Sequence, residues 1–186
     1  NVTDMNNMFK RALQFNQPLN SWDVSKVTDM YRCFCETAMF NQPLEDWNVS
    51  SVTDINEMFH KAANFNQPLC NWDVSNVTDM SGMFAYTNFN QSLQSWNVHN
   101  VTDMNKMFEQ ATQFDQPLDT WNVGSVTNMA SMFMNASSFN QPLSSWRVDQ
   151  VKDMNHMFDG AMAFNQPLHT WMISKDANVE KMLLTA

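Results

Sequence analysis

The feature that most constrains this chain is one phrase of sequence that is repeated along its whole length. The phrase reads VTDMSGMFAYTNFNQSLQSWNVHN from Val77, and the next copy begins at Val101. Successive copies begin 25, 25, 25, 24, 25 and 25 residues apart, at Val2, Val27, Val52, Val77, Val101, Val126 and Val151. A fixed period of this length is typical of solenoids and other repeat arrays, because each copy forms one unit that stacks on the next.

The apolar pattern within one copy predicts its local structure, with repeat positions counted from 1 at this valine. In residues 5–12 the apolar side chains are spaced three, one and three apart, which is typical of one face of a helix. Residues 16–19 contain a proline, which ends a helix and favours a turn. In residues 21–25 apolar Trp22 and Val24 alternate with polar residues, as in a half-buried strand. Each copy is therefore predicted to hold a strand, a tight corner, a short helix and a proline turn.

The predicted fold class is an α/β repeat solenoid, because one such unit cannot bury its apolar face alone. Strands of consecutive coils are expected to pair in parallel about 4.8 Å apart on one face, with the short helices on the other. We expect a single domain, residues 1–186, of about seven repeats of 24–25 residues, with residues 172–186 as a degenerate C-terminal capping repeat. The tryptophans at position 21 should form a buried stack: Trp22, Trp47, Trp72, Trp96, Trp121, Trp146 and Trp171.

One copy is a residue shorter than the others, and the missing residue lies between Phe84 and Phe89. Because this gap falls between the predicted helix and the turn, the later columns should keep their register. We therefore expect Phe89 to align with Phe65, and Trp96 to align with Trp72.

Two polar columns recur almost as regularly as the apolar ones. Asparagine at position 15, replaced once by Asp115, is followed by glutamine in every copy. This pair could form a binding strip, but its regularity favours a ladder that satisfies backbone groups at the turn. Aspartate at position 3 could form a calcium row, but its place before a predicted helix favours helix capping. Asn128 replaces this aspartate in one copy. A helix cap tolerates asparagine better than a row of calcium-binding carboxylates does.

Composition excludes several classes of function. A net charge of −9 with ten Lys and Arg argues against nucleic acid, and no apolar run is long enough for membrane insertion within this segment. The four histidines stand at four different repeat positions, and no catalytic or phosphate-binding motif is present. We therefore expect no enzyme, cofactor or metal site. Three cysteines cannot form a disulfide framework, and Cys33 stands in a methionine column, which predicts a buried apolar thiol.

The polar side chains of the predicted strand, at positions 20 and 22, should point away from the core. We call them the outward face: Ser21, Asp23, Asp46, Asn48, Asn71, Asp73, Ser95, Asn97, Thr120, Asn122, Ser145 and Arg147. They are candidate ligand-binding residues, because packing does not occupy them. They are small and polar rather than aromatic, which favours a glycan, or no ligand at all, over a protein partner.

The phrase W-x-V-S-x-V-T-D-M-x-x-M-F…F-N-Q-P-L, which runs from Trp72 to Leu93 with Ser92 in place of proline, resembles the bacterial surface protein repeat. That repeat is known from mycoplasma lipoproteins, from surface proteins of other bacteria and from some algae and protists, and it is similar to the BspA-like branch of leucine-rich repeats. The resemblance covers nearly the whole chain, with local departures such as Lys152 in place of threonine. It implies a right-handed, leucine-rich-repeat-like superhelix at the cell surface or in the extracellular space, often linked to adhesion. It carries no catalytic residues.

Two classes of function remain open. The first is a non-enzymatic adhesion or binding module, which would hold a surface protein or a glycan on the outward face. The second is a purely structural spacer or assembly subunit, whose outward face is only solvated. An ice-binding array of threonine and asparagine columns is a weaker interpretation, since the threonines are expected to cap helices.

The sequence treats the two ends of the chain differently. After Trp171 the phrase decays, although Val179 and Met182 still occupy apolar positions, as in a terminal repeat. The first copy opens at Val2 without a preceding strand or cap, so Trp22 should be exposed at its edge. Apolar ends of this kind associate or are covered. We therefore expect either end-to-end self-association through the N-terminal coil, or further repeats or a cap before it.

Overall fold

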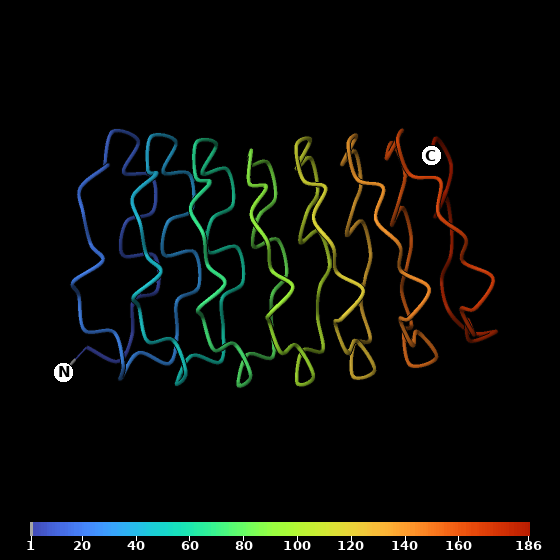
Figure 1. The fold of residues 1–186 in the computed structure, drawn as a ribbon, viewed down its shortest axis with the longest axis horizontal. Helices are drawn as coiled ribbons and strands as arrows, with labels where there is room; N and C mark the ends of the chain where they lie inside the picture. The colour runs from blue at the N-terminus through green and yellow to red at the C-terminus, as the bar shows by residue number, and fades with distance from the viewer. Residues whose placement is uncertain (1) are drawn as a thin grey trace.

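The computed structural model describes residues 2–186, which wind into coils stacked along the long axis of the molecule, with the two termini at opposite ends (Figure 1). Consecutive coils are joined at repeat position 3 by isolated parallel β-bridges. The bridges link Asp4 to Asp29, Asp29 to Asp54, Asp54 to Asp79, Asp79 to Asp103, Asp103 to Asn128, Asn128 to Asp153, and Asp153 to Asn178. The row of bridges holds each coil in register with the next.

The predicted α/β solenoid, with its leucine-rich-repeat-like layers of strands and helices, is wrong. Residues 2–186 contain no helix, and the single bridges at position 3 are the only β pairing in that range. Within the same residues, no helix has the length and apolar character needed to cross a membrane. The coils are built from turns instead.

The segment predicted as a helix is a run of tight turns, as residues 55–61 illustrate. The Glu57 N–H points along the stack and donates to the Ser81 carbonyl of the next coil at 2.8 Å. The Met58 N–H turns back and donates to the Ile55 carbonyl at 3.1 Å, three residues earlier rather than the four of an α-helix. Glu57 has a φ of +51°, and positive φ at the third residue is the mark of a type II turn. The alternation sends every second N–H to the neighbouring coil, which no helix can do.

Positive φ recurs at repeat positions 6 and 10 in almost every coil, mostly at residues other than glycine. Such a conformation is costly for a side-chain-bearing residue, so the surrounding hydrogen bonds must impose it. The inter-coil bonds supply that constraint, because positions 6 and 10 both donate to the next coil; the Lys61 N–H, for example, donates to the Ala85 carbonyl at 2.9 Å.

The segment predicted as a strand is also made of turns, but the tryptophan column is buried as predicted. Trp96 is 3% exposed and stacks on Trp72 with ring centroids 6.4 Å apart and planes within 1° of parallel. Its indole Nε1–H donates to the Leu69 carbonyl of the preceding coil at 2.9 Å. Trp22, in the first coil, is 43% exposed. Each buried indole therefore packs against its neighbours and also ties its coil to the one before.

Two phenylalanine columns fill the core beside the tryptophans. Phe59 stacks on Phe65 of its own coil at 3.9 Å and on Phe84 of the next coil at 5.9 Å. The shorter copy keeps this register as predicted, since Phe89 stacks on Phe65 at 6.1 Å. The methionine column packs into the same core, and Cys33, which stands in that column, is fully buried. Burial in apolar surroundings raises the pKa of the Cys33 thiol.

The asparagine column forms the predicted backbone ladder. The Asn66 Oδ1 accepts the N–H of Asn90 in the next coil at 2.9 Å and the Gln91 side-chain amide at 3.2 Å. Asp115 does the same with one carboxylate oxygen, which accepts the N–H of Asn140 at 2.9 Å. Regular polar side chains at the turn therefore satisfy backbone groups and join coils, as amide ladders do in other stacked assemblies.

Candidate functional site

All twelve residues of the outward face are exposed, although they do not lie on a strand. Many of them hold their own coil in shape. At position 22, the Asp73 Oδ1 accepts the Ser75 N–H at 3.1 Å, an Asx turn that lowers the pKa of this carboxyl through the hydrogen bonds from Ser75. At position 20, the Ser95 hydroxyl donates to the Cys70 carbonyl of the preceding coil at 2.7 Å. This surface is therefore accessible, but much of its hydrogen-bonding capacity is used within the chain.

The aspartates at position 3 cap turns rather than helices. The Asp54 Oδ1 accepts the Asn56 N–H at 2.8 Å, and the same bond two residues ahead recurs from coil to coil. The prediction that this position caps free N–H groups is thus confirmed, but the capped element is a turn and not the predicted helix. Burial, with the neighbouring carboxylates Asp79 and Asp29, raises the pKa of Asp54. Among residues 2–186, no group of three or more histidines, cysteines and acids is placed to hold a metal ion.

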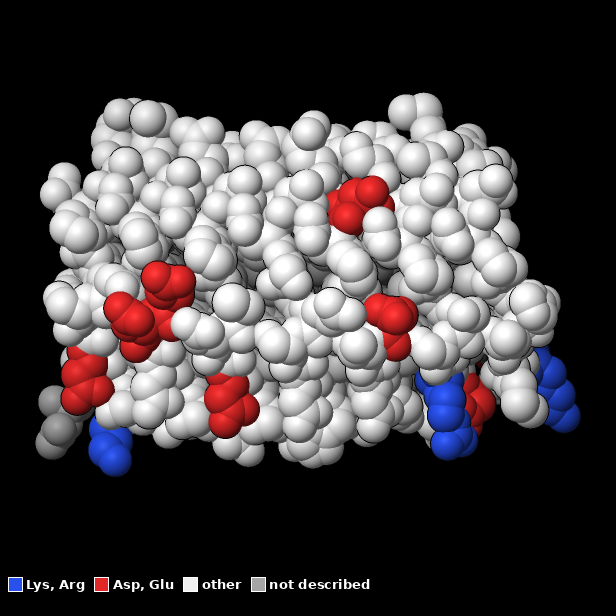
Figure 2. All heavy atoms as spheres, viewed as in Figure 1, with Lys and Arg blue, Asp and Glu red and all other residues white. Residues whose placement is uncertain are grey.

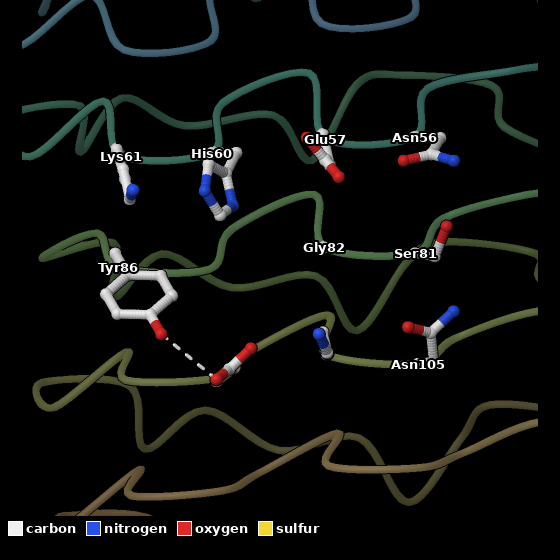
Figure 3. A pocket seen from close by; sticks show the side chains of 10 residues that line it. Asn56, Glu57, His60, Lys61, Ser81, Gly82, Tyr86 and Asn105 are labelled. Atoms are coloured by element: carbon white, nitrogen blue, oxygen red, sulfur yellow. Dashed lines mark hydrogen bonds between the residues drawn. The ribbon is translucent and has the colours of Figure 1, made fainter.

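A polar hollow on another side of the coils, which we call the central pocket, brings together side chains from three consecutive coils (Figure 3). Its volume is about 340 Å³. All of its lining residues come from repeat positions 5, 6, 9 and 10. They are Asn56, Glu57, His60 and Lys61 of one coil, Ser81, Gly82 and Tyr86 of the next, and Asn105, Lys106 and Glu109 of the third.

The pocket is hollow because its middle coil carries small residues. Positions 5, 6 and 9 of that coil are Ser81, Gly82 and Ala85, between coils with larger side chains at the same positions. Gly82 has a φ of +59°, as its counterparts in other coils do, so the turn does not require glycine there. A Cβ at Gly82 would lie 3.0 Å from the Glu57 Cγ, closer than an ordinary contact, so a side chain at this position would push the Glu57 side chain aside. Gly82 therefore matters because it has no side chain beside Glu57, and not because its turn needs a glycine.

His60 and Tyr86 form one end of the pocket. The edge of one ring meets the other, with centroids 5.5 Å apart and planes at 67°. The His60 Nδ1 is buried and has no hydrogen-bond partner among residues 2–186, and burial lowers the pKa of this imidazole. Tyr86 is 40% exposed, and its hydroxyl donates to the Glu109 carboxylate at 3.1 Å. The Lys61 ammonium lies 5.6 Å from the centre of the Tyr86 ring, so the ring is held from several sides.

Among the residues that line the pocket, the formal charges balance. Two lysines, Lys61 and Lys106, stand with two glutamates, Glu57 and Glu109. Glu57 is paired with Arg32 of the preceding coil at 2.6 Å. Burial alone would raise the pKa of Glu57, but the hydrogen bond and charge of Arg32 lower it. Arg32 therefore keeps the Glu57 carboxylate ionised, and the imidazole of His60, whose pKa burial lowers, adds no charge at neutral pH.

The recurring residues of the sequence do not reveal this site, because the pocket arises where the columns vary. One signal was present: the chain has only three glycines, and Gly82 stands in a column that holds larger side chains in the other coils. The four histidines do stand at four different repeat positions, so they do not form one column. A site can nevertheless combine one of them, His60, with residues at other positions of adjacent coils.

A chain of stacked, turn-built coils whose sequence repeats coil by coil is a tandem-repeat protein. The family model described as "Mycoplasma protein of unknown function, DUF285" matches residues 1–95 and again residues 85–186, and the chain belongs to this family. This confirms the resemblance to a mycoplasma repeat; it does not single out the BspA-like leucine-rich repeats. No curated protein and no solved structure matches the chain.

Proposed function

We propose that the chain is a non-enzymatic cell-surface repeat module that binds a protein or glycan ligand. The central pocket carries this proposal. The recurring columns satisfy one another through packing and hydrogen bonds, whereas the pocket places the partly buried imidazole of His60 and several charged side chains around an open volume. Some of these side chains also bond within the chain, as Glu57 does to Arg32 and Tyr86 to Glu109. The side chains of Lys61, Lys106 and His60, however, face the hollow without a hydrogen-bonding partner among residues 2–186, and polar groups placed around a concave volume are typical of a binding site.

Location at the cell surface or outside the cell is part of the same proposal. Its support is the resemblance of the repeated phrase to bacterial surface protein repeats. Kinship with BspA-like surface proteins is also proposed on that phrase alone, and it does not extend to strand-and-helix architecture, which residues 2–186 lack.

The alternative is a purely structural spacer or assembly subunit. The outward face favours it, because side chains such as Asp73 and Ser95 are engaged in turns and inter-coil bonds rather than free for a ligand. One face of the molecule is also largely uncharged, with few carboxylates, some of them side by side, and with its visible basic side chains along one margin (Figure 2). Such a surface can simply be solvated.

The experiment that separates these functions is a binding screen of the purified, fluorescently labelled chain against a glycan array and an array of host surface proteins. Retained binding to members of either array supports a binding module. Binding to neither array favours the spacer. The double variant Asp46→Asn and Asp73→Asn removes two charges from the outward face while keeping a side-chain oxygen at each turn, so a loss of binding in this variant alone would move the site to that face.

A further inference from the structure

We propose that the central pocket binds a neutral, hydroxyl-rich sugar residue of a glycan. The inference rests on the proposed binding function and narrows it to one site and one class of ligand. It depends on three properties of the pocket: its balanced charge, its mixture of donors and acceptors, and its half-exposed aromatic ring.

The balance of charge argues against a charged ligand. Lys61 and Lys106 could attract an anion, but Glu109 lines the same 340 Å³ volume and would repel it, as would Glu57 to the extent that its pairing with Arg32 leaves its charge unscreened. A cation meets the same conflict with its signs reversed. A neutral ligand avoids both penalties, since it brings no unpaired charge into a partly desolvated site.

The polar groups suit hydroxyls, each of which can both donate and accept a hydrogen bond. The lysine ammonium groups donate, as can the second N–H of the Asn56 and Asn105 amides, whose first N–H bonds to an aspartate, while the Glu57 and Glu109 carboxylates accept. The buried Nδ1 of His60 has no acceptor near it, which favours the neutral tautomer with its proton on Nε2. That tautomer makes Nε2 a further donor. A ring of hydroxyls can satisfy such a set, whereas a purely apolar ligand would leave it unpaired.

The aromatic ring provides the apolar part of the site. Tyr86 has an apolar body and a polar tip, and the tip is fixed by its bond to Glu109 at 3.1 Å. A sugar ring likewise has an apolar face of C–H groups bounded by hydroxyls, so it can lie on the exposed tyrosine and reach the polar groups around it. The pocket volume is at the small end of the roughly 300–1,000 Å³ typical of small-molecule sites, which suits one or two sugar residues.

The backbone makes the site rigid. The peptide group between Ser81 and Gly82, in the middle coil, is bonded to both neighbouring coils. Its N–H, from Gly82, donates to the Asn105 carbonyl at 2.8 Å, and its carbonyl, from Ser81, accepts the Glu57 N–H. A preformed site loses little conformational entropy when a small ligand binds.

The test is a titration of the ¹⁵N-labelled chain, followed by NMR. The probes are methyl glycosides of glucose, galactose, mannose and N-acetylglucosamine, and separately inorganic phosphate and sialic acid. Gly82→Asn fills the pocket with a residue that the same turn already accepts in Asn7, at a φ of +55°. Lys181→Asn introduces the same residue at position 6 of a remote coil and serves as its control. Tyr86→Gln removes the ring, and Tyr31→Gln makes the same replacement at the other tyrosine and serves as its control.

A neutral glycoside should shift amide signals around Gly82, and its affinity should fall at least tenfold in Gly82→Asn and in Tyr86→Gln but in neither control. Tyr86→Gln keeps the inference testable if Gly82→Asn unfolds, since its effect does not depend on filling the pocket. Shifts with phosphate or sialic acid only would overturn the choice of a neutral ligand. Shifts with none of the probes would overturn the pocket inference, while array binding that survives both pocket variants would leave the proposed function standing at another surface.

Discussion

The tryptophan column offers a strong test of the stacked architecture, because tryptophans at the same repeat position differ greatly in their exposed fraction. Trp96 is 3% exposed, between Trp72 and Trp121, whereas Trp22 is 43% exposed. Substitution by alanine removes the same atoms in both cases. The difference between Trp96→Ala and Trp22→Ala therefore measures what the neighbouring coils contribute.

The magnitude follows from burial. A tryptophan side chain of roughly 200 Å² buries nearly all of that area at Trp96 and little more than half at Trp22. At about 25 cal/mol per Å², the free energies of burial are about 5 and about 3 kcal/mol. The lost indole bond to Leu69 adds only about 1 kcal/mol, because that carbonyl also accepts the Trp72 N–H. We expect Trp96→Ala to cost about 4–6 kcal/mol and Trp22→Ala about 2–3 kcal/mol.

The assay is equilibrium urea denaturation followed by circular dichroism and by fluorescence. Stacked repeats can lose cooperativity, so coincidence of the two transitions has to be checked before free energies are compared. Trp96→Phe keeps an aromatic ring but removes the indole N–H, and it should fall between wild type and Trp96→Ala. Equal losses of stability in Trp96→Ala and Trp22→Ala would refute the assignment of the inside of the stack.

Three further predictions concern the ladder, the pocket histidine and the first coil. Asn66→Ala should lower the free energy of unfolding by about 1–3 kcal/mol, because the Asn90 N–H and the Gln91 amide lose their acceptor, whereas Asn66→Asp should cost much less, as Asp115 shows; equal losses in urea denaturation would contradict the ladder. Burial lowers the pKa of His60, whose charged neighbours are Glu57, Lys61, Glu109 and Glu36. Below about pH 6.5 the unfolded chain therefore binds more protons at this residue than the folded chain does. Stability should therefore fall as the pH drops below that value, and less steeply in His60→Gln; parallel profiles from calorimetry would exclude this group as the cause. The first coil exposes Val2, Met8 and Trp22, so the chain of 186 residues should associate with increasing concentration, and Met8→Lys should weaken this; light scattering that shows only monomer would count against self-association through that coil.

The stacking of coils could be predicted from the sequence because it depends on spacing alone. A period of 24–25 residues with Trp, Phe and Asn at fixed positions requires equivalent residues of successive coils to meet, and the rings of Trp72 and Trp96 do so. The local structure could not be predicted in the same way. Met5, Met8 and Phe9 have helical spacing, but alternating type II turns place the same residues on one side of the chain. The turns form instead of a helix because every second N–H donates to the next coil. The pattern of residues within one copy does not show where these N–H groups donate.

The pocket was harder to predict, because it depends on differences between coils. Gly82 matters only because Glu57 and Lys106 stand beside it in the stack, and His60 only because Tyr86 meets its ring. These residues are scattered through the sequence and carry no shared motif. Once the coils are known to stack in register, however, positions 5, 6, 9 and 10 can be read across neighbouring coils as one surface.

That surface differs in kind from the rest of the molecule. Positions 3, 15 and 22 supply side-chain oxygens to backbone N–H groups, and position 21 supplies an indole to a carbonyl, so substitution there disturbs the stack itself. At positions 6 and 10 the backbone makes the inter-coil bonds, which leaves the side chains free to vary, as the sequence shows by placing Arg, Glu, Gly, Lys, Ser and His at position 6. Changes at these positions should alter which ligand is held while altering stability little. A binding site of this chain is therefore expected where the repeat is least regular, because the stack does not require the same side chain there in every coil.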